Sequence, residues 1–189
     1  METVLVVSCE EKGVAFFSEA LIAASINRIT VLASAGEARY ALLEKSFDLV
    51  IIDSPLPDES GEILARYIAV KGFSQVILAV KKENFNAVYA VCQKDGILTI
   101  LKPVDKDFFG SALLLVKSVG IKLKRIQAEN TKLKQKIEDI RIIDKAKCLL
   151  ISYLSLTEQE SHRFIEKQAM DLRSTKRLIA EEIVKTYAN

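Results

Sequence analysis

The chain has 189 residues, half of them hydrophobic, with only three Pro and seven Gly, which excludes a disordered or linker-rich protein. No apolar run is long enough to cross a bilayer and no basic leader precedes the first apolar run, so we expect neither a membrane partner nor a signal peptide. Three scattered cysteines and the lone His162 predict a reduced, cytoplasmic protein without a zinc site. The net charge of +2 combines an acidic front half with a basic distal half, which favours a polyanionic partner for the latter.

Residues 1–117 alternate strand-like and helical patterns. Short apolar runs predict five strands, at Thr3–Val7, Ile29–Ala33, Asp48–Ile52, Gln75–Val80 and Ile97–Leu101. Helical spacing between them predicts an α/β domain with a doubly wound, five-stranded parallel sheet. In such sheets functional residues gather at the carboxyl ends of the strands, where Ser8, Cys9, Asp53 and Lys102 fall.

Two of these strand ends carry motifs: Asp-Leu-Val-Ile-Ile-Asp53-Ser-Pro-Leu-Pro-Asp-Glu-Ser-Gly61, and Lys102-Pro103. Here the chain resembles the receiver domain of two-component response regulators. The resemblance implies the flavodoxin-like fold, with Asp53 as acceptor of a phosphoryl group from a histidine kinase. It also implies that Lys102 contacts the phosphoryl oxygens.

The chain departs from the receiver pattern at the metal site and at the switch residue. The family has two adjacent carboxylates after the first strand, but this chain has Ser8 and Cys9, with Glu10 one position off. Val80 stands where the family has Thr or Ser. Because Mg²⁺ prefers carboxylate oxygens, we expect no cofactor here and regard Mg²⁺ binding as doubtful.

Two interpretations of Asp53 remain open. One is ordinary phosphorylation. The other is a degenerate receiver in which Lys102, with Lys81 or Lys82 nearby, holds Asp53 in a permanent ion pair. A receiver of the second kind would respond to a protein or a small molecule, or would serve mainly as a platform for dimerisation.

Apolar residues recur in heptads from Val116 to Ile140. One core position holds Val116, Leu123, Asn130 and Ile137, and the other holds Val119, Ile126, Leu133 and Ile140. This spacing predicts a coiled-coil linker helix over 118–140, and the single Asn favours two parallel helices in register. We therefore expect a homodimer. The alternative is a charged connector helix that stays monomeric.

Residues 141–189 predict a bundle of three amphipathic helices. The first should end near Ser155. Thr157 and Glu160 have capping-box spacing at the start of the second, and Ser174 is a candidate N-cap for the third. The expected buried positions include Ile143, Ala146, Leu149, Leu150 and Tyr153, then Phe164, Ile165, Ala169 and Leu172, and finally Leu178, Ile179, Ile183 and Val184.

Four stretches of this segment carry a second resemblance: Arg141-Ile-Ile-Asp-Lys-Ala146-Lys147, Leu-Thr-Glu-Gln-Glu, Ala169-Met170 and the final Ile-Ala-Glu-Glu-Ile-Val. They resemble the ANTAR domain, an RNA-binding module of bacterial transcription antiterminators, although Cys148 replaces the usual Gly. The resemblance implies binding to paired hairpins in nascent leader RNA, which prevents a terminator stem from forming. The order of receiver, coiled coil and ANTAR domain is itself a family architecture.

Hairpin recognition needs cations for phosphates and flat groups for unstacked bases. The candidate RNA-binding cations are Lys147, Lys167, Arg173, Lys176 and Arg177, each of which could instead be a solvated surface charge. Tyr187 is a candidate for base stacking, whereas Tyr153 is expected in the core.

The sequence thus predicts an RNA-binding antitermination regulator rather than an enzyme. Leader RNA hairpins and a second copy of the chain are the expected partners, with a sensor kinase and a sequestering protein as further candidates. The alternatives are a phosphorylation-dependent response regulator acting on DNA, and a coiled-coil signalling scaffold that binds no nucleic acid.

Overall fold

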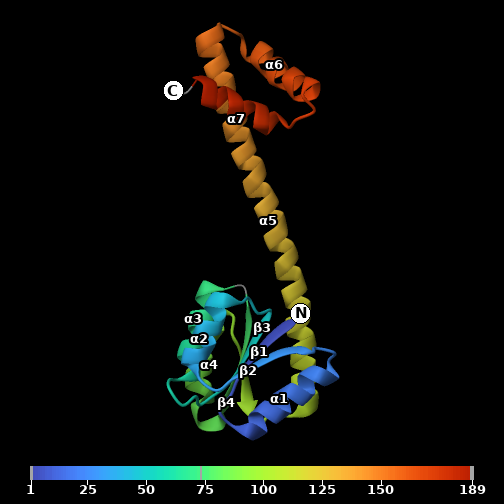
Figure 1. Ribbon diagram of the computed structural model, residues 1–189. Coiled ribbons are helices and arrows are strands. Elements are labelled where there is room, and N and C mark those ends of the chain that lie inside the picture. Colours follow the sequence, from blue (N-terminus) through green and yellow to red (C-terminus); the bar gives the residue numbers. More distant parts are fainter. Residues whose placement is uncertain (1, 73, 188–189) are drawn as a thin grey trace. The chain divides into compact units, whose positions relative to one another are not determined.

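A computed structural model of the chain describes residues 2–72 and 74–187. The chain divides into two compact units, Met1–Leu123 and Lys124–Asn189 (Figure 1). Helix α5, Lys106–Leu154, contributes to both units. The division into 1–117, 118–140 and 141–189 stays a prediction, and its outer ends, residues 1 and 188–189, lie outside the described residues.

The first unit contains the predicted parallel sheet, with strand order β2-β1-β3-β4-β5. The strands are β1 Thr3–Val7, β2 Arg28–Leu32, β3 Leu49–Asp53, β4 Gln75–Lys81 and β5 Leu98–Lys102. Every neighbouring pair is parallel. Because β1 and β3 are buried on both faces, their side chains are almost uniformly aliphatic. The predicted fold class is confirmed.

Helices cover both faces of this sheet (Figure 1). They are α1 Glu11–Ala23, α2 Ala35–Glu44, α3 Gly61–Lys71, α4 Phe85–Cys92 and the first turns of α5, with short 3₁₀ turns η1 Lys82–Asn84 and η2 Gln93–Asp95. Helices α2, α3 and α4 pack on the face presented by Val7 and Ile52. Helices α1 and α5 pack on the opposite face, presented by Val6 and Ile51.

The start of α5 belongs to the core of the first unit. Phe109, Leu113 and Val116 are buried against the sheet. Val116 was predicted as the first position of the dimer seam, and that assignment is wrong. The spacing from 109 to 116 continues a single helical face, and the sheet has already covered it. The exposed seam therefore begins at Val119.

The second unit packs α6 Glu158–Asp171 and α7 Lys176–Tyr187 with the last turns of α5. The predicted capping box is confirmed: Glu160 N–H donates to Thr157 Oγ1 at 3.3 Å, and Thr157 N–H donates to Glu160 Oε2 at 2.8 Å. Ser174 does not cap α7. Instead, Thr175 Oγ1 accepts the N–H of Leu178 at 3.3 Å. Thr175 directly precedes α7, so its side chain lies where an N-cap residue reaches the N–H three positions later.

The core of this bundle is narrower than predicted. It is formed by Ala146, Leu150, Ile165, Ala169, Ile179, Ala180 and Ile183. Its three alanines let the helices approach closely, so neighbouring large side chains remain at the flanks. Phe164, Leu172, Leu178 and Tyr153, all predicted to be buried, are exposed. Tyr153 is 60% exposed and packs against Tyr187, with ring centroids 5.3 Å apart.

Although α5 is long, neither it nor any other helix in residues 2–72 and 74–187 has an apolar stretch suited to spanning a bilayer.

Candidate functional site

Three predicted pocket residues meet at the carboxyl edge of the sheet. Asp53 ends β3, Lys102 ends β5, and Ser8 directly follows β1. Lys102 Nζ lies 2.5 Å from Asp53 Oδ1, and Ser8 Oγ donates to Asp53 Oδ2 at 2.8 Å. The side chain of Asp53 is only 3% exposed. Both carboxylate oxygens are therefore held by donors, one from the end of β1 and one from the end of β5.

Helix α1 covers the same carboxylate at Gly13. A β-carbon at position 13 would lie 2.0 Å from Asp53 Oδ2 and 2.8 Å from Ser8 Oγ. No side chain fits in this space, so only glycine permits the observed approach of the helix. Sequence reasoning did not single out Gly13. A glycine in the first turn of a helix was the available signal. Glycine weakens a helix, so its presence there indicates a packing or functional reason.

The remaining predicted pocket residues make no recorded hydrogen bond to Asp53 in the part of the chain that the structure describes. Cys9 is exposed, and its thiol lies 3.6 Å from the carbonyl oxygen of Pro55. Glu10 is exposed, and its backbone N–H donates to Ser8 Oγ at 3.3 Å. Val80 is buried in β4 and offers no hydroxyl.

The donors around Asp53 do not fit Mg²⁺, the ion that receiver domains use. Mg²⁺ requires octahedral oxygen ligands, usually with one or two carboxylates. Here an ammonium and a hydroxyl engage the single buried carboxylate. Within residues 2–72 and 74–187, no group of three or more His, Cys, Asp or Glu side chains is arranged to hold a metal ion.

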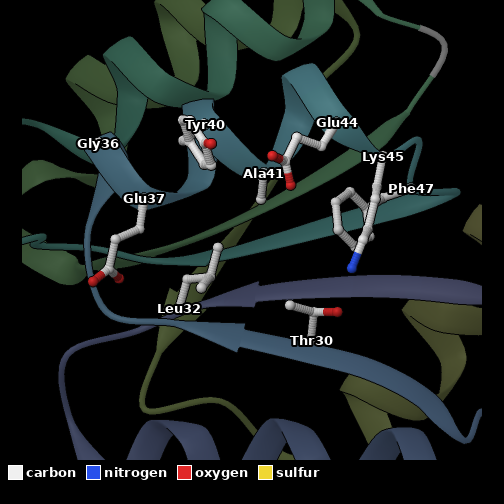
Figure 2. A pocket seen from close by; sticks show the side chains of 9 residues that line it. All are labelled: Thr30, Leu32, Gly36, Glu37, Tyr40, Ala41, Glu44, Lys45 and Phe47. Carbon is white, nitrogen blue, oxygen red and sulfur yellow. The ribbon is translucent and has the colours of Figure 1, made fainter.

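A second cavity of about 500 Å³ lies between β2 and α2 (Figure 2). Leu32, Ala41 and Phe47 form its apolar part, and Thr30, Gly36, Glu37, Tyr40, Glu44 and Lys45 complete the lining. Glu37 already accepts the backbone N–H of Ala33 at 2.9 Å. No sequence pattern indicated this cavity, and it shares no lining residue with the Asp53 pocket.

Three of the five candidate RNA-binding cations join the helices of the second unit. Lys147 lies 2.8 Å from Asp144 and 3.4 Å from Glu158, connecting α5 with the start of α6. The hydrogen bond to Asp144 raises the pKa of Lys147 above its ordinary value. This residue therefore has a structural role in the bundle.

Lys176 and Arg177 extend the ion-pair network to α7. Lys176 bonds Glu166 on α6 at 2.5 Å, which lowers the pKa of that carboxyl. Arg177 contacts Glu181 at 2.8 Å and Asp139 on α5 at 2.7 Å. The bond to Glu181 raises the pKa of the guanidinium.

Lys167 and Arg173 are the accessible members of the candidate set. Both are exposed, and neither forms an ion pair with another described residue. Arg173 lies in the turn between α6 and α7, with a left-handed backbone φ of 47°, and its N–H donates to the carbonyl oxygen of Met170 at 3.2 Å. These two cations are available for phosphate contacts without disrupting the bundle.

The apolar seam of α5 is exposed in a single chain. Its members are between 42% and 60% exposed: Val119, Leu123, Ile126, Leu133, Ile137 and Ile140. Asn130 on the same stripe is also exposed. A large apolar stripe on an isolated helix favours pairing with another helix.

Comparison with known proteins finds matches to both units. Residues 131–184 match the model of the ANTAR domain family. The chain is 25% identical over 139 residues to the transcriptional regulatory protein PdtaR of Mycobacterium tuberculosis, covering 74% of this chain and 68% of PdtaR. Among solved structures, the receiver domain of the TMAO respiratory system response regulator TorR is 24% identical, covers 67% of this chain and 99% of that chain, and has a TM-score of 0.52.

The signal receiver domain of an HD domain-containing protein from Pseudomonas fluorescens Pf-5 is 20% identical. It covers 66% of this chain and 92% of that chain, with a TM-score of 0.59. These likenesses establish the fold of the first unit.

Proposed function

We propose that this chain, which joins a receiver-fold domain to a C-terminal ANTAR domain, is an RNA-binding transcription antitermination regulator. The match of residues 131–184 to the ANTAR family is the observation that carries the proposal. The protein acts by binding: its ANTAR unit holds hairpins of a nascent leader RNA and so prevents a terminator stem from forming. Such a shift between RNA folds needs only differential affinity and no covalent step.

A dimer suits this task because two hairpins can then be held together. Once one ANTAR unit has bound, the second contact becomes effectively intramolecular. The exposed seam from Val119 to Ile140 supports pairing of two α5 helices. Of the candidate cations, Lys167 and Arg173 are the accessible ones, while Lys147, Lys176 and Arg177 connect the helices of the bundle.

The RNA-binding proposal is tested with a Lys167→Ala/Arg173→Ala variant and an RNA carrying two tandem hairpins. Each lost phosphate contact should reduce the salt slope of binding by about 1, so we expect weaker binding and a slope lower by about 2. A Lys12→Ala/Lys94→Ala variant removes the same charge from the receiver unit and should bind like the parent chain. Equal binding by all three proteins, or preference for duplex DNA, contradicts the proposal.

The receiver-fold unit, in this proposal, does not use ordinary Mg²⁺-dependent phosphorylation. Two observations support this part of the proposal. Lys102 and Ser8 engage the carboxylate oxygens of Asp53, and helix α1 packs closely against the same carboxylate at Gly13. Its input is instead a protein or a small molecule. Incubation with acetyl phosphate and Mg²⁺, followed by intact mass measurement, should show no added phosphate. Stoichiometric acid-labile phosphate on Asp53 would refute this part of the proposal.

A further inference from the structure

The charges beside the α5 seam differ along its length. In the heptad register of the seam, Lys122, Glu129 and Lys136 occupy g positions, and Gln127, Lys134 and Arg141 occupy e positions. In a parallel pair of helices, each g residue faces the e residue of the next heptad on the other helix. A two-fold dimer contains each such contact twice.

The three g-to-e contacts are chemically distinct. Lys122 faces Gln127 of the partner subunit, which is neutral. Glu129 faces Lys134 of the partner subunit, which is attractive. Lys136 faces Arg141 of the partner subunit, which places two cations together. A parallel dimer would therefore have two favourable contacts in its middle heptad and two unfavourable contacts at its distal end.

Within a single chain, one of these two cations has an ion-pair partner on its own helix. Lys136 is exposed and forms no ion pair with another described residue. Arg141 Nη1 forms a long ion pair, 3.8 Å, with Glu138 Oε2 on its own helix, and both side chains are exposed, so the attraction between them is weak. Two further carboxylates of this region are already engaged, Asp139 by Arg177 at 2.7 Å and Asp144 by Lys147 at 2.8 Å. A like-charge contact of this kind disfavours pairing until an anion lies between the two groups.

We infer that Lys136 and Arg141 of the partner subunit form a phosphate site that is complete only in the dimer, and that it binds the RNA backbone. The inference rests on the proposed function, since it requires both dimerisation and an RNA ligand. A guanidinium beside an ammonium matches phosphate oxygens well. Both residues lie inside the stretch that matches the ANTAR family, 131–184. RNA and dimerisation are then linked reciprocally: each strengthens the other.

Reversal of the charge at position 136 separates the effect of the site on dimerisation from its effect on RNA binding. In the full-length Lys136→Glu variant, both like-charge contacts become ion pairs. Exposed pairs are worth about 0.2–1 kcal/mol each, so the dimer without RNA should be roughly tenfold tighter than that of the parent chain. The same variant should bind a two-hairpin RNA more weakly, and RNA should no longer tighten its dimer.

Two further variants provide controls. Lys122→Glu makes the same charge change at a g position that faces neutral Gln127, so its dimer should not tighten. Lys136→Glu/Arg141→Glu restores like charges at the distal contact, so the tightening should disappear. Sedimentation equilibrium with and without the two-hairpin RNA measures all four proteins.

The outcomes distinguish this inference from the proposed function. A Lys136→Glu dimer no tighter than that of Lys122→Glu overturns the inference, as does a tightening that persists in the double variant. RNA that binds the parent dimer without tightening it also overturns the inference and leaves the proposed function intact. A parent chain that remains monomeric and binds no RNA refutes both.

Discussion

Substitution of Gly13 by Ala tests whether the close approach of α1 holds the Asp53 pocket in its observed arrangement. The added methyl group would lie 2.0 Å from Asp53 Oδ2. Carbon–oxygen contacts are normally about 3.3 Å or longer, so the helix and the carboxylate must separate by more than about 1 Å. That displacement would break the 2.8 Å bond from Ser8, the 2.5 Å contact with Lys102, or both.

The expected cost combines three contributions. Overpacking a buried site costs about 1–3 kcal/mol, and loss of a hydrogen bond to a charged group costs about 1.5–3 kcal/mol. Replacing Gly by Ala in a helix returns about 1 kcal/mol. We therefore expect the Gly13→Ala variant to lose about 1.5–5 kcal/mol of unfolding free energy.

Urea denaturation followed by far-ultraviolet circular dichroism measures this loss, and hydrogen exchange assigns it to β1 and β3. Gly110→Ala is the matched control, because nothing lies within 4 Å of a β-carbon at position 110 in α5. That variant should gain up to about 1 kcal/mol. If Gly13→Ala is as stable as Gly110→Ala, the pocket does not depend on the glycine and the reasoning is refuted.

Three further predictions concern the second half of the chain. The hydrogen bond from the Thr157 backbone N–H lowers the pKa of Glu160 from its ordinary value of 4.5. The capping box should therefore stabilise α6 above pH 4.5 and lose its contribution as the pH falls through the lowered pKa. Glu160→Gln should flatten this dependence on pH in an acid titration followed by far-ultraviolet circular dichroism. Tyr153→Ala should remove the ring contact with Tyr187. It should lower the unfolding free energy by about 0.5–1.5 kcal/mol more than the loss of buried apolar surface alone would, as measured by thermal denaturation. An unchanged midpoint would show that the ring contact contributes nothing to stability. Asn130→Ile should tighten the dimer and weaken its preference for two parallel helices, measured by sedimentation and by cross-linking of single-cysteine variants; an unchanged dimer constant would place Asn130 outside the seam.

Local signals were sufficient for the order of elements and for several of their ends. The five strands follow from short aliphatic runs, and the start of α6 follows from two side chains three positions apart. Such features depend on neighbours along the chain, so the residues themselves predict them. The resemblances to the receiver and ANTAR families added the identity of Asp53, Lys102 and the terminal bundle, and they agree with the observed architecture.

The tertiary structure decided which side chains within those elements remain available. Val116 has the spacing of a seam residue, but the sheet buries it. Lys147, Lys176 and Arg177 have the charge of RNA ligands, but carboxylates on other helices engage them.

By itself, the sequence determined that this chain has an α/β domain, a heptad helix and a small helical bundle, because periodicity and capping act over a few residues. Only the fold decided that Gly13 lies against Asp53, forty positions away, and that Asp139 reaches Arg177. Packing and charge pairing depend on distances in space, and one-dimensional spacing does not specify those distances.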